Sequence, residues 1–155
     1  MSGRAHILAW IAFLVALNGF SPCASADSPA GLAFLAGAGL PRAVYYGDCG
    51  LDLPSVVTFQ SNFTSSTSLR VTSRYDYVAF DPRLPESTIL AVPMTQVSAL
   101  NYRGSVDVGA EAFAYLRGGD GIMRYSVSAI DAYGAAVAGP SGTIAVYACA
   151  RLSAK

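Results

Sequence analysis

The chain has 155 residues, with ten Lys and Arg, ten Asp and Glu, and a single histidine. The formal net charge is therefore zero, and the basic residues are scattered along the chain. Binding along a phosphate backbone needs a basic stripe, so we expect no nucleic-acid partner.

The first 26 residues have the pattern of a secretory signal peptide. Arg4 lies in a short polar start, residues 7–17 are uninterruptedly apolar, and Ala24 and Ala26 offer small residues for cleavage. A spanning helix needs about 20 apolar residues, whereas Asn18 ends this run early. We expect cleavage after Ala26, no membrane span in the mature chain, and a secreted location, which is extracellular, periplasmic or at the cell surface.

The expected mature chain has no histidine, because His6 is removed with the signal. This excludes Ser-His-Asp and Cys-His catalysis and histidine-ligated metal oxidases. The sequence thus predicts a protein that is not an enzyme and that uses no cofactor and no metal.

The mature chain is long enough for one core and too short for two ordinary domains. Residues 27–43 are rich in Ala, Gly and Pro, and predict a partly flexible leader, with packing of this apolar segment on the domain as the alternative. Residues 44–150 predict a single β-sandwich domain, and residues 151–155 a C-terminal tail.

From Leu53 onward the chain has the pattern of short strands. Alternating or β-branched segments are separated by turn signals such as Asp81-Pro82, Arg103-Gly104, residues 118–121 and Gly139-Pro140, which indicates an antiparallel sandwich or barrel. No segment has a sustained helical period. The predicted strands are residues 55–59, 68–75, 75–80, 88–92, 95–102, 112–117, 123–130 and 142–149.

The most regular segment is YSVSAIDAYG, residues 125–134. Its period of two sends Tyr125, Val127 and Ala129 to one face and the intervening serines to the other. Gly134 suits the turn that follows, and Pro140, which lacks an N–H group, indicates a loop before the closing strand. The segment therefore predicts a wall of the core rather than a site.

Residues 125–147 resemble the last two strands of fibronectin type III domains. The shared pattern is Y-x-V-x-A-x-D-x-x-G, followed by a loop that ends in Pro-Ser. The tryptophan of the family's second strand is absent, and Met123 stands where a tyrosine is usual. The resemblance implies an all-β, antiparallel immunoglobulin-like (fibronectin type III-like) β-sandwich, and the cysteine pair described next predicts that one disulfide closes it. The residues that match are Tyr125, Val127, Ala129, Asp131, Gly134, Pro140 and Ser141.

Cys49 and Cys149 are the two cysteines of the mature chain. An even pair in an exported protein predicts a disulfide, and a zinc site would need more ligands. In a plain fibronectin-type sandwich these positions lie far apart. We therefore expect residues 42–49 to run along the closing strand, with 43–46 as a short strand; a different topology is the alternative.

Two further kinds of candidate site come from polar and aromatic residues. Asn62 begins the sequon Asn-Phe-Thr in a Ser/Thr-rich connection, residues 60–68, and is a candidate for glycosylation; an ordinary polar loop is the alternative. Exposed tyrosines suit protein or carbohydrate surfaces, and partial burial with the hydroxyl at the rim is the alternative. The candidate binding tyrosines are Tyr45, Tyr46, Tyr75 and Tyr77.

Carboxylates supply two alternatives with chemistry of their own. Glu86 and Glu111, with the aspartates, could form a glycosidase pair, and Asp48, Asp52 and Asp120 near glycines could bind calcium. In both cases we favour solvated carboxylates.

The sequence as a whole predicts a secreted or cell-surface module that binds or assembles without catalysis, on a protein or carbohydrate surface. Two alternatives stay open. One is a pilus or fibre subunit of the chaperone–usher type, and the other is a small hydrolase that uses carboxylates alone.

Overall fold

The computed structural model describes residues 31–37, 40–49 and 53–149. The expected signal peptide, the start of the leader and the C-terminal tail lie outside the described residues. Within them, the secondary structure in chain order is β1 (Ala33–Gly37), β2 (Ala43–Gly47), β3 (Val56–Thr64), β4 (Leu69–Ala79), β5 (Leu90–Gln96), β6 (Asn101–Asp107), α1 (Val108–Leu116), β7 (Gly121–Asp131) and β8 (Ala136–Cys149).

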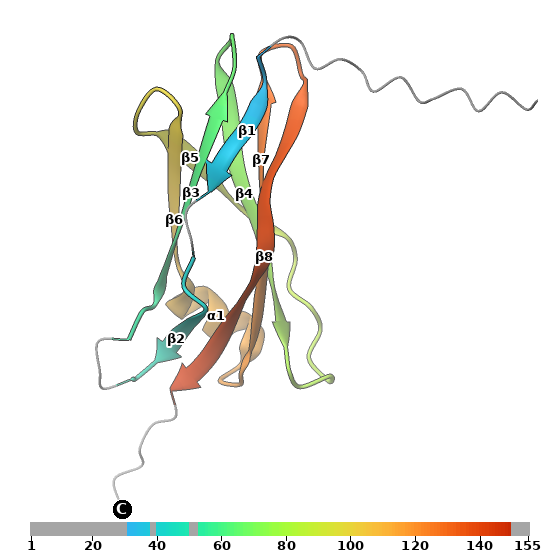
Figure 1. Cartoon of the computed structure of the whole chain (residues 1–155). Helices are drawn as coiled ribbons and strands as arrows, with labels where there is room; N and C mark the ends of the chain where they lie inside the picture. The colour runs from blue at the N-terminus through green and yellow to red at the C-terminus, as the bar shows by residue number, and fades with distance from the viewer. Residues whose placement is uncertain (1–30, 38–39, 50–52, 150–155) are drawn as a thin grey trace, which may run out of the picture.

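The strands form one curled sheet in the order β1-β3-β6-β5-β4-β7-β8-β2 (Figure 1). β5 holds the two halves together, because Leu90–Met94 pair with β4 while Thr95 and Gln96 pair with β6. All these pairs are antiparallel except β2–β8, which is parallel. The prediction of a β-rich, antiparallel protein is confirmed except at the parallel pair β2–β8, and the helix α1 departs from the predicted all-β chain.

The concave side of the sheet holds one hydrophobic core. In β7, Val127 and Ala129 are almost fully buried and Tyr125 is half-buried, while Ser126 is exposed. The expected alternation of this strand is therefore confirmed. Burying one valine side chain stabilises the fold by about 1.5–3 kcal/mol.

The expected disulfide is present between Cys49 and Cys149, whose Cα atoms lie 4.8 Å apart. β2 runs parallel to β8 in the register Ala43↔Ala145 through Gly47↔Cys149, which brings the two cysteines side by side. The prediction of a short strand beside the closing strand is thus confirmed. The leader packs on the domain where it is described, since β1 pairs with β3.

Residues 112–117 were predicted as a strand, and this was wrong, because they belong to α1. The Asp107 side chain caps the helix by accepting a hydrogen bond from the N–H of Gly109 at 3.0 Å. Val108, Ala112 and Leu116 are the buried residues, spaced four apart, so the helix places one narrow apolar stripe on the sheet. Because α1 has only nine residues, this stripe was too short to give a sustained helical period.

Several predicted boundaries between strands were also wrong, among them those of 88–92 and 95–102, which the structure replaces by β5 and β6. The predicted strands 68–75 and 75–80 are the single strand β4. Arg103-Gly104 was expected to be a break and lies inside β6. A Cβ on Gly104 would lie 3.1 Å from Cγ of Met94, so the glycine allows the close approach of β5 and β6 rather than a turn.

Pro140 was expected in a loop and lies within β8. The pairing of β7 with β8 shifts between Ser126↔Ser141 and Ser128↔Ala138, so that two residues, Gly139 and Pro140, stand opposite one. Such a bulge leaves a residue unpaired in the ladder, and a proline can occupy it without losing a hydrogen bond.

Candidate functional site

The convex side of β4 and β7 carries a row of polar side chains that the core does not use. The core takes every second residue of each strand, which leaves the intervening positions facing outward. We call these outward residues the β4–β7 outer face. Its members are Arg70, Thr72, Arg74, Ser126, Ser128 and Ile130.

The register of the sheet sets these residues in cross-strand pairs. Thr72 stands opposite Ser128, and Arg74 opposite Ser126. On the β5 side the neighbours are small, with Ala91 beside Arg74 and Pro93 beside Thr72. Two long arginine side chains therefore rise from a floor of short ones.

This difference in side-chain length produces two adjoining hollows. The first, of about 150 Å³, is lined by Arg70, Thr72, Arg74, Ser128 and Ile130. The second, of about 260 Å³, shares Arg74 with it and continues toward Asp76, Arg124 and Ile89. Arg74 thus stands between two parts of one shallow groove.

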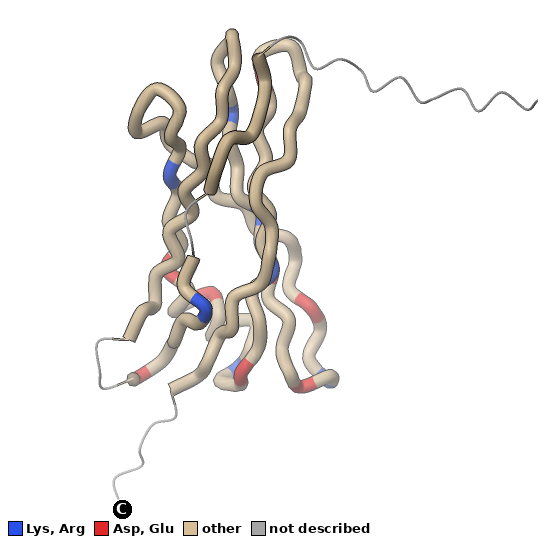
Figure 2. The backbone as a smooth tube through the Cα atoms, in the orientation of Figure 1, with Lys and Arg blue, Asp and Glu red and all other residues tan. Residues whose placement is uncertain are grey.

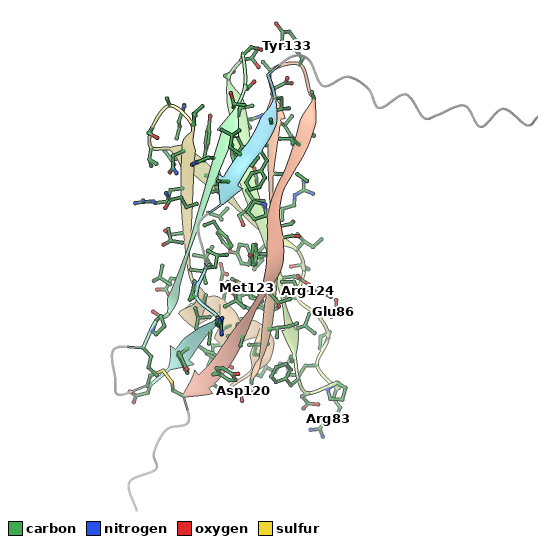
Figure 3. The ribbon with its side chains drawn as sticks, viewed as in Figure 1. Arg83, Glu86, Asp120, Met123, Arg124 and Tyr133 are labelled. Atoms are coloured by element: carbon green, nitrogen blue, oxygen red, sulfur yellow. A yellow bond between two sulfur atoms is a disulfide. The ribbon has the colours of Figure 1, made fainter. Side chains whose placement is uncertain are left out.

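The far end of the groove is closed by an ion-pair cluster of Arg124, Asp76 and Glu86. The Arg124 guanidinium bonds both oxygens of Asp76 and lies 2.6 Å from Oε2 of Glu86. Figure 3 shows the side chains of Arg124 and Glu86 next to each other below the middle of the sheet. The hydrogen bonds to Asp76 and Glu86 raise the pKa of Arg124, and because two carboxylates surround this one guanidinium, the cluster carries a formal charge of −1.

Arg70 and Arg74 have no such compensation. Among the described residues, neither takes part in a salt bridge or a side-chain hydrogen bond, and both are exposed. Figure 2 shows most acidic positions in the half of the molecule that holds α1 and β2. The part of the outer face that lies away from α1 therefore presents two arginines, Arg70 and Arg74, that have no salt-bridge partner among the described residues.

Of the four candidate binding tyrosines, Tyr46, Tyr75 and Tyr77 are buried, with exposed fractions of 2%, 5% and 1%. They point into the core, because the inward positions of β2 and β4 carry them. As they lie, these three side chains offer no exposed contact surface. Tyr45 faces the other way, is half-buried, and packs on Tyr147 with ring centroids 5.7 Å apart.

Two of the buried tyrosines, Tyr75 and Tyr77, have a shared partner that the sequence did not reveal. Glu111 of α1 accepts hydrogen bonds from the hydroxyls of Tyr75, at 3.0 Å, and Tyr77, at 3.2 Å. Burial, followed by the hydrogen bond and charge of Glu111, raises the pKa of Tyr75, and burial and the same charge raise that of Tyr77. The cluster attaches the helix to the sheet.

Asn62 lies in β3 rather than in a loop, since β3 extends to Thr64. Its Oδ1 accepts a hydrogen bond from Nδ2 of Asn101 at 2.6 Å, and the side chain is half-buried. Its glycosylation stays a prediction.

The two glutamates lie on opposite sides of β4. Glu111 meets inward-pointing tyrosines, whereas Glu86 meets Arg124 beside the outward-pointing Asp76. Of the aspartates considered for calcium, Asp120 accepts a hydrogen bond from the N–H of Ala148, and Asp52 lies outside the described residues. In the part of the chain that the structure describes, no group of three metal-ligating side chains comes together.

A separate hollow of about 520 Å³ lies at the end of the sheet nearest α1. Exposed Phe80 and the turn after α1 line it, with Arg117 and Asp120 supplying charges of both signs. The mixture of opposite charges gives this hollow no clear electrostatic preference.

Sequence reasoning missed the outer face, although a signal was present. The segment LRVTSR alternates arginine and threonine with apolar or small residues, and YSVSAI does the same with serine. The period of two identified each outward set separately. It could not tell that β4 and β7 are neighbours or that their register aligns Thr72 with Ser128.

Comparison with models of known protein families gives no match, and comparison with curated proteins gives no significant match. Within the described ranges, no helix has the length and apolar character needed to cross a membrane.

Proposed function

We propose that this protein is an exported, non-catalytic binding module whose ligand lies on the β4–β7 outer face. The observation that carries the proposal is the pair of exposed, uncompensated arginines, Arg70 and Arg74, at a groove floored by short side chains. Export is supported by the signal-like start of the chain and by the disulfide, since disulfides persist in oxidising compartments.

We further propose that the curled sheet is an immunoglobulin-like, fibronectin type III-like sandwich. The strand order supports this, because β1-β3-β6 form one half and β5-β4-β7-β8 the other. The N-terminal segment contributes to both halves, with β1 antiparallel to β3 and β2 parallel to β8. In such a sandwich the outer side of the second half is an open surface on which a ligand can lie.

The two alternative functions have less support. A chaperone–usher pilus subunit would lack its last strand, whereas β8 pairs along most of its length with β7. A glycosidase needs two carboxylates that flank one bond, whereas Glu86 and Glu111 lie on opposite sides of β4. Glu86 also forms an ion pair with Arg124.

The proposal is tested by blocking the face with a bulky side chain. The purified mature protein, labelled at its N-terminus, is added to intact cells and extracellular matrix of the producing organism. Ser126→Trp fills the groove beside Arg74, so we expect saturable binding by the wild type and its loss in this variant.

The matched control is Ser105→Trp on β6, which also places a tryptophan at an exposed strand position. Thermal unfolding is used to check that both variants remain folded. Equal binding by Ser126→Trp and Ser105→Trp, or no binding by the wild type, would overturn the proposal.

A further inference from the structure

We infer that the ligand of the β4–β7 outer face is an acidic polysaccharide, which is a chain of sugars bearing carboxylate or sulfate groups. This inference rests on the proposed function and adds the chemical class of the ligand. It follows from which groups of the face are free to bind, from their charge, and from the shape of the floor between them.

The backbone of this face is not free to bind. Residues 71–75 of β4 pair with β5 on one side and with β7 on the other, and β7 pairs with both β4 and β8, so the ladders use the peptide groups of this central part of the face. An extended peptide is commonly recognised by adding a strand to an open sheet edge, and this face has none. Recognition must therefore come from side chains alone.

The side chains that remain are cations and hydroxyls. Arg70 and Arg74 each present a planar fork of N–H donors, which matches the two oxygens of a carboxylate or a sulfate. They are four positions apart along one strand, which places their Cα atoms about 13 Å apart. Two anionic groups repeated along one chain would satisfy both arginines, and a single small anion would satisfy only one.

The floor between the arginines suits sugar rings. Thr72 and Ser128 face each other across the strands, and Ser126 continues the row next to Arg74. Their hydroxyls both donate and accept hydrogen bonds, as sugar hydroxyls do. The groove is shallow, and Ile130 is the one large apolar side chain in the part between the arginines, so the deep pocket that anchors an aromatic side chain of a protein partner is missing from it.

The chemical class of the ligand is tested by comparing the affinity of the protein for charged polymers with and without sugar rings. Binding of the full mature protein is measured by isothermal titration calorimetry against polygalacturonate, dextran sulfate, neutral dextran, polyglutamate and polyphosphate, over a series of salt concentrations. We expect binding to one or both acidic polysaccharides, weakening as salt screens the charges, and little binding to neutral dextran. We expect weaker binding to polyglutamate and polyphosphate, because neither offers ring hydroxyls to Thr72 and Ser128.

The arginines are tested with a double variant and a matched control. Arg70→Gln/Arg74→Gln should weaken binding to the polysaccharide at least tenfold, because each lost charged hydrogen bond contributes about a factor of ten. Arg103→Gln/Arg117→Gln removes the same net charge from two exposed arginines outside the groove and should change binding less than threefold. Thermal unfolding confirms that both variants are folded.

Equal losses in the two double variants would mean non-specific attraction, and would overturn the site. Binding of polyglutamate or polyphosphate as tight as that of the polysaccharides would overturn the sugar class while leaving the face a binding surface. Failure to bind any acidic polysaccharide would overturn the inference, whereas the cell-binding experiment with Ser126→Trp would still decide the proposed function by itself.

Discussion

Cys49 and Cys149 lie with their Cα atoms 4.8 Å apart, although 100 residues separate them in the chain. Each cysteine lies at or just beyond the end of its strand, and the two strands are the parallel neighbours β2 and β8. The bond therefore fixes the N-terminal segment beside the closing strand at the end of the molecule that also holds α1 (Figure 1).

The disulfide should contribute a large share of the stability. Because the bond closes a loop that spans most of the domain, Cys49→Ser/Cys149→Ser should lower the free energy of unfolding by about 2–4 kcal/mol. Urea denaturation of the oxidised wild type and of the variant measures the difference. Limited proteolysis should cut the variant near β2. Free thiols in the folded, secreted protein, detected by mass spectrometry, would contradict the premise.

The Glu111 cluster should be sensitive to loss of its acceptor. Glu111→Ala leaves the buried hydroxyls of Tyr75 and Tyr77 without their partner, which should cost about 1–3 kcal/mol of stability. Glu111→Gln keeps an acceptor oxygen and serves as the matched control, with a smaller expected loss. Equal stability of Glu111→Ala and the wild type would show that the hydroxyls find other partners.

The same cluster predicts a loss of stability at alkaline pH. Burial and Glu111 raise the pKa of Tyr75 and Tyr77 above the ordinary value of 10.0, so the folded state holds these protons more tightly than the unfolded state. The resulting stabilisation is fully present below pH 10 and is lost as pH rises above it. Urea denaturation between pH 8 and pH 11, with tyrosinate absorbance followed in parallel, measures this decrease. A stability that is constant or rising above pH 10 would refute the assignment.

The close contact of α1 with the start of β7 should make Gly121 intolerant of a side chain. A Cβ there would lie 2.5 Å from the carbonyl oxygen of Val78 and 2.8 Å from Cδ2 of Leu116. Gly121→Ala should therefore lower stability by about 1–3 kcal/mol, because the backbone must move. Gly119→Ala, in the exposed turn just before, is the control and should lose less. The two variants are compared by thermal unfolding, and the reverse order would contradict the packing described.

The cap of α1 provides a test of the element that was wrongly predicted from sequence. Asp107→Ala removes the side-chain acceptor of the Gly109 N–H group and should cost about 0.5–2 kcal/mol. Asp107→Asn retains an acceptor and should cost less. Circular dichroism and urea denaturation measure helix content and stability. A variant as stable as the wild type would mean that packing of Leu116 and its neighbours alone holds the helix.

The residue pattern of the sequence was enough to predict that β7 lines the core and that Cys49 and Cys149 form a disulfide. The alternation of Tyr125, Val127 and Ala129 indicates which side chains of one strand share a face, because successive side chains of a strand point to opposite faces of the sheet. The cysteine pair predicted the disulfide, because two thiols in an exported protein have few other fates.

Only the tertiary structure decided what each face meets. Tyr75 and Tyr77 share a face by pattern, but their burial against Glu111 depends on a contact 34 to 36 residues away in the chain. Arg70 and Ser128 lie in the same groove because β4 and β7 are neighbours in one particular register. Periodicity fixes the direction of a side chain within its own strand, whereas strand order and register depend on the packing of the whole chain, and the candidate binding face is a product of both.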